Sequence, residues 1–154
     1  MVGGRGPVDI AVLLRDSVGQ LMVLADQRRV DVGFEGRVAP WVSAPAAELR
    51  SVFDNLIDNA VRYAQEGGVV DVRLHMVEGR AVVDVVDDGP GIPPDQLDRV
   101  FDRFFRVAGA PAGGSGLGLA IAQAAALRHG MRIVLANRGD RSGLIARVHL
   151  PIAS

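Results

Sequence analysis

Two asparagines and an arginine recur at helical spacing within the segment NLIDNAVRYA, residues 55–64. Asn55, Asn59 and Arg62 stand at i, i+4 and i+7, so a helix would align them along one side. An amide oxygen is a good ligand for a hard cation, and an arginine one turn further on suits phosphate. The row could therefore hold Mg²⁺ and a polyphosphate together. The alternative is a solvated row that tolerates two poor helix formers at a cost of ~1 kcal/mol.

A carboxylate at the end of a predicted strand forms a second candidate group, in the sequence DDGPG at residues 87–91. Asp87 shares a strand face with Val83 and Val85, so its side chain should point into the interior. A buried carboxylate is costly without a partner. The amino group of adenine would be a suitable donor, whereas guanine presents a carbonyl there, and the adjacent glycines would let a flat ring approach. The alternative is an ordinary turn, for which Asp-Gly and Pro-Gly pairs are typical.

A glycine-rich run, GGSGLGL at residues 113–119, leads directly into a predicted helix. The amide groups at a helix N-terminus and the helix dipole both favour an anion. Small residues without periodicity at 107–116 predict a mobile loop before that helix, and Arg103 and Arg106 precede the loop. The run is therefore a candidate phosphate cradle. The alternative is a flexible loop without a ligand.

The elements around these residues decide whether they meet. Apolar periodicity predicts helices over residues 8–28, 45–64, 93–105 and 117–129. Alternating and apolar runs predict strands over residues 30–35, 40–43, 70–77, 81–87, 131–137 and 144–150. Within residues 70–77, Val70, Val72, Leu74 and Met76 form the predicted buried face. This order of elements predicts an α+β fold, a two-layer α/β sandwich with a mixed, mostly antiparallel sheet and helices on one face.

Composition limits the classes of function. The chain has 154 residues, a formal net charge of −1 and no cysteine. One domain over residues 7–154, after a linker at residues 1–6, accounts for this length. The charge balance gives no electrostatic case for binding nucleic acid or an anionic membrane, and no apolar run approaches the ~20 residues needed to cross a bilayer. All 17 basic residues are arginine, so a phosphate loop of the Walker type, which needs a lysine, is excluded.

Four motifs in a fixed order resemble the catalytic domain of sensor histidine kinases. That family belongs to the ATPase superfamily shared with DNA gyrase, heat-shock chaperones and mismatch-repair ATPases. The motifs are NLIDNAVRYA at 55–64, DDGPGI at 87–92, VFDRFFR at 100–106 and GSGLGLAIA at 114–122. The resemblance extends from Pro7 to Pro151 and implies an ATP-binding domain with Mg²⁺ as cofactor and a mobile ATP lid.

The resemblance also implies a role for each residue that matches a motif. Asn59 would coordinate Mg²⁺ with Asn55 as a second ligand, and Asp87 would accept a hydrogen bond from the adenine amine. Arg103 or Arg106 would reach the γ-phosphate. The remaining implied nucleotide contacts are Arg62, Tyr63, Gly89, Gly91, Ile92, Gly114, Ser115, Gly116, Leu117, Gly118 and Leu119. Three phenylalanines would anchor the lid and dock the phosphoacceptor domain, with an ordinary core role as the alternative: Phe101, Phe104 and Phe105.

The residue one turn before the implied metal ligand distinguishes phosphate transfer from hydrolysis. Hydrolysing members of the superfamily place a glutamate there, where it activates water. Asn55 cannot act as a base at neutral pH, and a histidine acceptor needs less help because neutral imidazole is already a nucleophile. The resemblance therefore implies transfer to histidine. Two alternatives stay open: an anti-sigma-type kinase or another hydrolase of the superfamily, and a nucleotide sensor without catalysis.

The three histidines are interpreted as structural, because His75 and His149 lie on predicted strand faces and His129 ends a predicted helix. The acceptor histidine would then lie upstream of Val2, on the dimerisation and phosphotransfer helices of a parent kinase. A response regulator would be an indirect partner. We expect a monomeric, cytoplasmic domain that binds ATP, cannot phosphorylate itself and contacts neither membrane nor nucleic acid. Its parent is expected to be an inner-membrane sensor.

Overall fold

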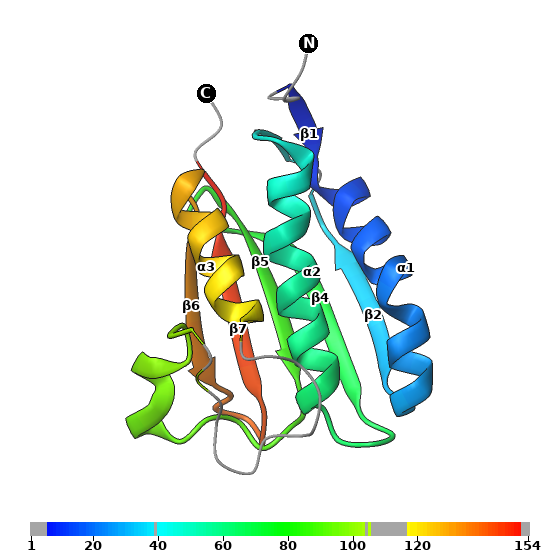
Figure 1. Ribbon diagram of the computed structural model, residues 1–154. Coiled ribbons are helices and arrows are strands. Elements are labelled where there is room, and N and C mark those ends of the chain that lie inside the picture. Colours follow the sequence, from blue (N-terminus) through cyan, green and yellow to red (C-terminus); the bar gives the residue numbers. More distant parts are fainter. Residues whose placement is uncertain (1–5, 39, 104, 106–116, 152–154) are drawn as a thin grey trace.

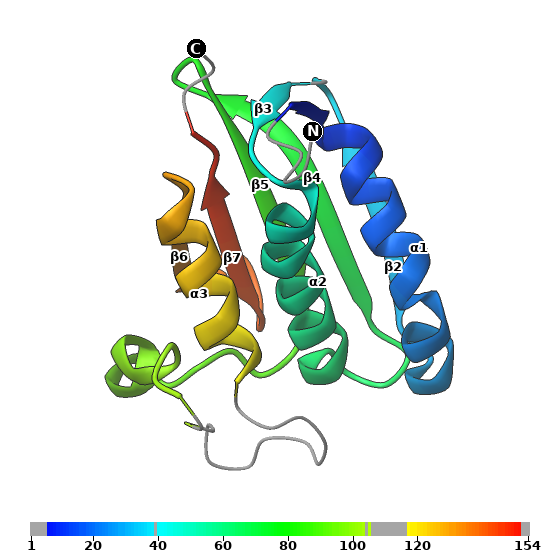
Figure 2. The same cartoon turned by 45° about the horizontal axis from the view of Figure 1, so that its top comes forward.

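Three helices lie side by side on one face of a five-stranded sheet (Figure 1, Figure 2). The computed structural model describes residues 6–38, 40–103, 105 and 117–151. The helices are α1 (Ile10–Arg28), α2 (Ala46–Tyr63) and α3 (Gly118–Arg128). The predicted sandwich with helices on one face is confirmed.

The sheet is mixed and mostly antiparallel, with the strand order β2-β4-β5-β7-β6. Its strands are β2 (Asp31–Gly36), β4 (Val69–Val77), β5 (Arg80–Asp87), β6 (Arg132–Asn137) and β7 (Leu144–His149). Among the strands of the described residues, only β2 and β4 are parallel neighbours. A separate two-stranded sheet pairs β1 (Pro7–Asp9) with β3 (Trp41–Ser43). The six predicted strands differ from the observed ones by at most one residue at either end, whereas β1 was not predicted.

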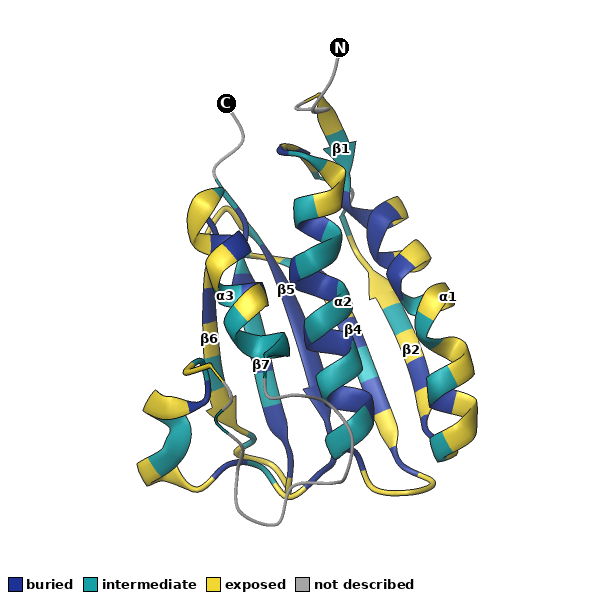
Figure 3. Cartoon of the chain, viewed as in Figure 1, coloured by how far each residue is buried: buried dark blue, intermediate teal, exposed yellow. Residues whose placement is uncertain are grey.

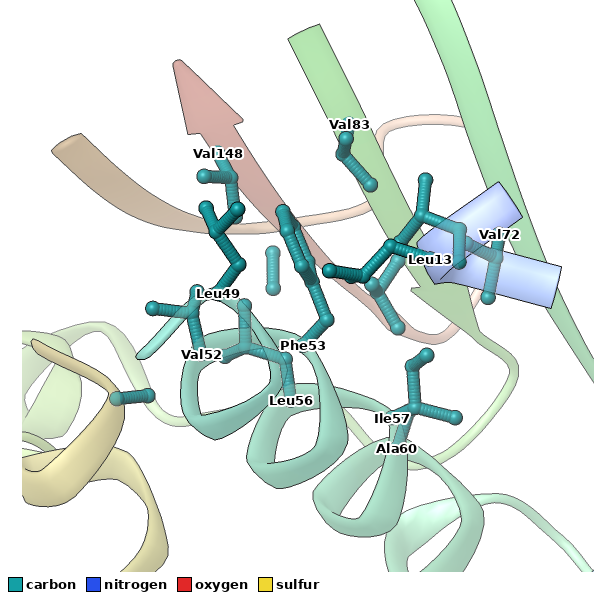
Figure 4. Packing of buried hydrophobic residues seen from close by; sticks show 14 of the residues in the cluster. Leu13, Leu49, Val52, Phe53, Leu56, Ile57, Ala60, Val72, Val83 and Val148 are labelled. Carbon is teal, nitrogen blue, oxygen red and sulfur yellow. The ribbon is translucent and has the colours of Figure 1, made fainter. Parts of the chain in front are cut away.

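The core lies between the helices and the sheet, and α2 supplies its centre. The buried stripe of α2 recurs at helical spacing and includes Leu49, Val52, Phe53, Leu56 and Ala60. Figure 4 shows the ring of Phe53 pointing toward the strands that carry Val83 and Val148. The helices are buried on the side that faces the sheet, and the opposite side is exposed on α1 and α3 and mostly half-buried on α2 (Figure 3). An apolar stripe of this kind fixes the rotation of α2, and with it the direction of its polar margin.

Polar contacts from α1 hold the C-terminal half of α2 in place. Ser17 Oγ donates to Asp54 Oδ1 across the helix pair. At the far end, Arg28 Nε donates to the carbonyl of Val61 at 3.0 Å, and Arg28 Nη2 donates to the carbonyl of Arg62 at 2.7 Å. The last carbonyls of a helix lack partners within the helix, so Arg28 completes the end of α2 that carries the predicted phosphate ligand.

The first helix begins at Ile10, whereas periodicity predicted a start at Val8. Asp9 Oδ1 accepts from the amides of Ala11 at 2.9 Å and Val12 at 3.3 Å. This side chain caps the helix, and the residues before a cap are not helical. They pair instead with β3. None of the helices in the described part of the chain combines the length and the apolar character needed to cross a bilayer.

The helix predicted over residues 93–105 is wrong. Only Pro94–Arg99 is helical, as a 3₁₀ helix, and turns follow as far as Arg103. Val100 is buried and forms a second small cluster with Ile92 and Leu144. These tertiary contacts override the local helical periodicity, which is a weak determinant on its own.

One residue of β4 departs from the predicted alternation. Val70, Val72 and Leu74 are buried as predicted, but Met76 is 47% exposed. Met76 lies close to the turn at Glu78 and Gly79, at the end of the sheet.

The sheet face without helices contains a buried charge. Asp84, in β5, is only 6% exposed. It accepts two hydrogen bonds from Arg147 of β7, at 2.8 and 2.9 Å, and its Oδ2 lies 2.9 Å from His75 Nε2 of β4. Burial would raise the pKa of Asp84, but the bonds from Arg147 and His75 outweigh it and hold this pKa below its usual value. The cluster therefore ties three strands together while the carboxylate stays charged.

Arg147→Leu should lower the free energy of unfolding by ~1–3 kcal/mol near neutral pH, because Asp84 stays buried and loses its bidentate partner. The folded-state pKa of Asp84 is depressed, so its stabilising effect is complete above the unfolded pKa and is lost as the pH falls through the folded value. In urea unfolding, the difference from the wild type should therefore shrink in acid. Arg132→Leu on β6 is the matched control. A loss that is equal in both variants would contradict a specific role for the Asp84 pair.

The described chain begins and ends at the same end of the molecule. Gly6 precedes β1 and Pro151 follows β7. The last turn of α2 and the end of β5 lie at the opposite end, and α3 begins beside the middle of α2, at Asn55 (Figure 1). That opposite end carries most of the described residues that were predicted to bind a nucleotide.

Candidate functional site

The polar margin of α2 places two amide side chains beside the start of α3. Asn55 and Asn59 are both half-buried. Asn55 Nδ2 donates to the carbonyl of Ser51 at 2.6 Å, and a Cβ added to Gly118 would lie 3.2 Å from Asn55 Oδ1. The side chain of Asn59 makes no hydrogen bond with any other described residue. Its amide oxygen is therefore available to a ligand.

Arg62 extends this row by one turn, and part of its guanidinium is already bound. Its Nε donates to Asp58 Oδ1 at 2.7 Å, as an i, i+4 ion pair on α2. Neither Nη group has a partner in the described part of the chain. Both Nη groups of Arg62, with four N–H donors between them, thus remain for a phosphate.

Asp87 ends β5 with a side chain that is 2% exposed. Its Oδ1 accepts from the amides of Gly89, at 2.9 Å, and Leu144, at 3.3 Å. No described residue donates to its Oδ2, so one oxygen remains for an external donor. Burial raises the pKa of Asp87, although both amide bonds act in the opposite direction. This environment favours a ligand that brings its own hydrogen-bond donor.

The glycines after Asp87 bring the loop at residues 87–92 close to α2 and to the β6–β7 turn. A Cβ on Gly89 would collide with the carbonyl of Tyr63, the last residue of α2. Gly91 has φ +75°, and a Cβ there would collide with the side chain of Asn137. The contact with Tyr63 places Asp87 at the end of α2 that carries Asn59, one turn before Tyr63. The predicted base and metal groups therefore lie at the same end of the domain.

The second aspartate of this loop has a structural role that the sequence pattern did not indicate. Asp88 is 9% exposed. It accepts from the amide of Val69 at 3.0 Å and from that of Gln65 at 3.3 Å, and its own carbonyl accepts from Gln65 Nε2. Asp88 therefore fastens the loop to the connection between α2 and β4.

Ile92 was predicted to pack on the base, but its side chain is 6% exposed and belongs to the small cluster with Val100 and Leu144. Phe101 and Phe105 are half-buried and pack against that cluster, and the guanidinium of Arg99 lies 4.7 Å from the centre of the Phe105 ring. A core role accounts for much of the surface of both rings.

α3 begins where the predicted phosphate cradle ends. Leu117 immediately precedes the helix, Gly118 is its first residue, and Leu119 is half-buried against the core. The amide groups of this helix N-terminus lie next to Asn55 on α2. Arg103 is exposed. The other residues predicted for the lid lie outside the described part of the chain: Phe104, Arg106, Gly114, Ser115 and Gly116.

Each histidine lies in a setting consistent with a structural role. His75 binds Asp84, and His129 Nε2 lies 3.3 Å from Glu48 Oε1, which also binds Arg128. His149 lies on the open face of the sheet, where burial and nearby arginines lower its pKa. None of the three is on an exposed helical face.

Three residues of the β6–β7 turn contact the loop at 87–92 and were not predicted from the sequence: Asn137, Arg138 and Ser142. Asn, Arg and Ser are ordinary residues in a turn between strands, so their types alone carried no signal. Their contacts depend on the register that places β7 beside β5.

Comparison with known proteins defines the class. The model of the histidine kinase-, DNA gyrase B-, and HSP90-like ATPases matches residues 45–154. The chain belongs to this ATPase family. The described site therefore lies in a fold whose members are ATPases, in agreement with the family that the four sequence motifs indicated.

Relatives narrow the class further. The chain is 43% identical over 127 residues to the signal transduction histidine-protein kinase/phosphatase MprB of Mycolicibacterium smegmatis, covering 80% of this chain and 25% of that protein. A solved mycobacterial sensor histidine kinase MprB matches with a TM-score of 0.86 and 30% identity, over 95% of this chain and 97% of that one. Full-length ShkA in complex with AMPPNP matches with a TM-score of 0.78 and 26% identity, over 97% of this chain and 31% of that one. The chain is thus a histidine kinase catalytic ATPase domain, and spans about a quarter of the curated MprB.

Proposed function

We propose that this chain binds Mg-ATP and presents the γ-phosphate to a histidine on the dimerisation and phosphotransfer helices of a parent kinase. The observation that carries the proposal is Asp87, a buried carboxylate with one oxygen left for an external donor. The ATPase family and the AMPPNP bound to the similar ShkA support an adenine nucleotide as the ligand.

Asp87 provides the recognition of the base. Its Oδ2 accepts a hydrogen bond from the adenine amino group, while Oδ1 is held by the amides of Gly89 and Leu144. A guanine carbonyl at the same place would face a carboxylate, and two acceptors cannot bond. Absence of side chains at Gly89 and Gly91 keeps the backbone close to the ring.

The polar row of α2 provides the metal and phosphate ligands. Asn59 binds Mg²⁺ through its amide oxygen, and Asn55 offers a second oxygen beside the start of α3. Bound Mg²⁺ supplies neutralisation of the charge that develops on the transferred phosphate. The Nη groups of Arg62 and the amide groups of the α3 N-terminus hold phosphate oxygens. We assign the γ-phosphate contact to Arg103 or Arg106.

Asn55 favours transfer over hydrolysis. An amide is not a base at neutral pH, so Asn55 does not activate water. A neutral imidazole needs no such base, since its free ring nitrogen is a nucleophile. His75 and His129 of this chain are bound to Asp84 and Glu48, which supports an acceptor carried by another segment.

A phosphotransfer assay tests this function. The chain is mixed with γ-labelled ATP and Mg²⁺, alone and with separately prepared acceptor-helix domains of candidate kinases. We expect acid-labile label on a histidine of one acceptor domain and none on this chain. If the chain releases inorganic phosphate from ATP as fast without an acceptor domain as with one, the result would support a hydrolase instead. Failure to bind ATP in calorimetry would overturn the proposal.

A further inference from the structure

Asn137, the last residue of β6, holds the backbone of one residue of the candidate base loop at two points. The amide of Ile92 donates to Asn137 Oδ1 at 2.8 Å, and Asn137 Nδ2 donates to the carbonyl of Ile92 at 2.7 Å. Both distances are those of good hydrogen bonds. The two bonds reach the two peptide groups that flank Ile92, so together they fix the orientation of the Ile92 backbone as well as its position.

The turn between β6 and β7 holds the loop at two further points. Ser142 Oγ donates to the carbonyl of Gly89 at 2.6 Å, and Arg138 Nη1 donates to the carbonyl of Asp87 at 3.2 Å. The guanidinium of Arg138 is itself held by Asp140, at 2.9 and 3.0 Å. The base loop is thus anchored near its start, its middle and its end by one hairpin.

We propose that Asn137 is a positioning residue that sets the selectivity for adenine. This inference rests on the proposed function, in which Asp87 recognises the base through a single hydrogen bond. Such a bond weakens steeply when its angle departs from linearity. The loop residues beside the adenine ring must therefore hold its amino group in line with Oδ2 of Asp87. Gly91 and Ile92 follow Asp87 in the same short loop, and Gly91 packs directly on the Asn137 side chain. Asn137 therefore fixes the position of these loop residues relative to Asp87.

Without Asn137, the backbone of Gly91 and Ile92 would lose its polar anchor, although Ser142 and Arg138 still hold the start of the loop, and the nucleotide itself would have to order this part. Ordering a free segment on binding costs affinity. A misaligned amino group would also form a weaker hydrogen bond with Asp87, so adenine would bind with less advantage over a purine that has a carbonyl at the same ring position. Asn137 therefore acts on the difference between bases, and not on the phosphate contacts made by α2.

Asn137→Ala tests the inference, with Arg141→Ala as matched control. Arg141 is an exposed residue of the same turn without a hydrogen bond or ion pair in the described part of the chain. Calorimetry with Mg²⁺ measures the affinities for ATP and for inosine triphosphate, which carries a carbonyl where adenine has its amino group. Hydrogen exchange in the nucleotide-free protein measures protection of the Ile92 amide.

In Asn137→Ala we expect ATP affinity to fall about tenfold and the ratio of ATP to inosine triphosphate affinity to fall about fivefold. The Ile92 amide should exchange at least about tenfold faster. Arg141→Ala should match the wild type in all three. An unchanged nucleotide ratio in Asn137→Ala, with a wild type that prefers ATP, would overturn this inference alone. A wild type that binds both nucleotides equally would overturn the role of Asp87 in the proposed function, and this inference with it.

Discussion

Asn59→Ala should reduce the affinity for ATP in the presence of Mg²⁺ to the level measured with a chelator. Asn59 is half-buried on α2, and its side chain makes no hydrogen bond with another described residue. Its amide oxygen is the ligand that we assign to the metal, and alanine offers none. Isothermal titration calorimetry with Mg²⁺ and with a chelator, on both proteins, measures the effect.

The folded state provides the control for this variant. Alanine is a better helix former than asparagine by ~0.5 kcal/mol, so the nucleotide-free variant should unfold at the same denaturant concentration as the wild type, or a higher one. Loss of binding combined with retained stability isolates the ligand role. A variant that binds Mg-ATP as tightly as the wild type would remove Asn59 from the metal site.

Asp87→Asn should weaken ATP binding by ~1–3 kcal/mol, or roughly 5- to 150-fold. The carboxamide can still accept from the amides of Gly89 and Leu144 through one oxygen. An amide NH₂ in place of the second oxygen would meet the adenine amine donor to donor. Calorimetry with ATP and Mg²⁺ measures the loss, and unchanged affinity would show that Asp87 is not in the base pocket.

Asp87→Asn should not lower the free energy of unfolding of the nucleotide-free protein at neutral pH, although it weakens ATP binding. The folded-state pKa of Asp87 is raised by burial, so the wild type loses stability as the pH rises from the unfolded pKa, about 3.9, through the folded value. Asp87→Asn removes that loss, and should be at least as stable as the wild type at neutral pH. Asp88→Asn is the matched control. It weakens the hydrogen bonds that Asp88 accepts from the amides of Val69 and Gln65, so it should lower the free energy of unfolding and leave base selectivity intact.

The sequence was sufficient for the parts of the fold that depend on local pattern. The buried stripe of α2 and the alternation of β4 specified which faces are covered, and the parity of β5 placed Asp87 with Val83 and Val85. The extent of the helix predicted over residues 93–105 was wrong because Val100 packs against Leu144, which is distant in sequence. Periodicity cannot report such contacts.

The candidate site shows the same division. Asn55, Asn59 and Asp87 follow from spacing and strand parity, since one helix or one strand carries each. Asn137 and Ser142 do not, because their roles exist only when β7 pairs with β5 and brings the turn beside the loop at 87–92. Asp88 looked like a turn residue, and its contact with the start of β4 depends on the pairing of β4 with β5.

The described chain begins and ends at one end of the molecule, and the last turn of α2 lies at the other. If the protein is attached to a solid surface through either terminus, the site that we assign to the nucleotide therefore points away from that surface. The 18 residues of α2 give this helix a length of ~27 Å, which separates the two ends of the domain. Chips or beads coated through a terminal tag should therefore present the domain in a single useful orientation, in which acceptor domains can approach without steric hindrance from the surface.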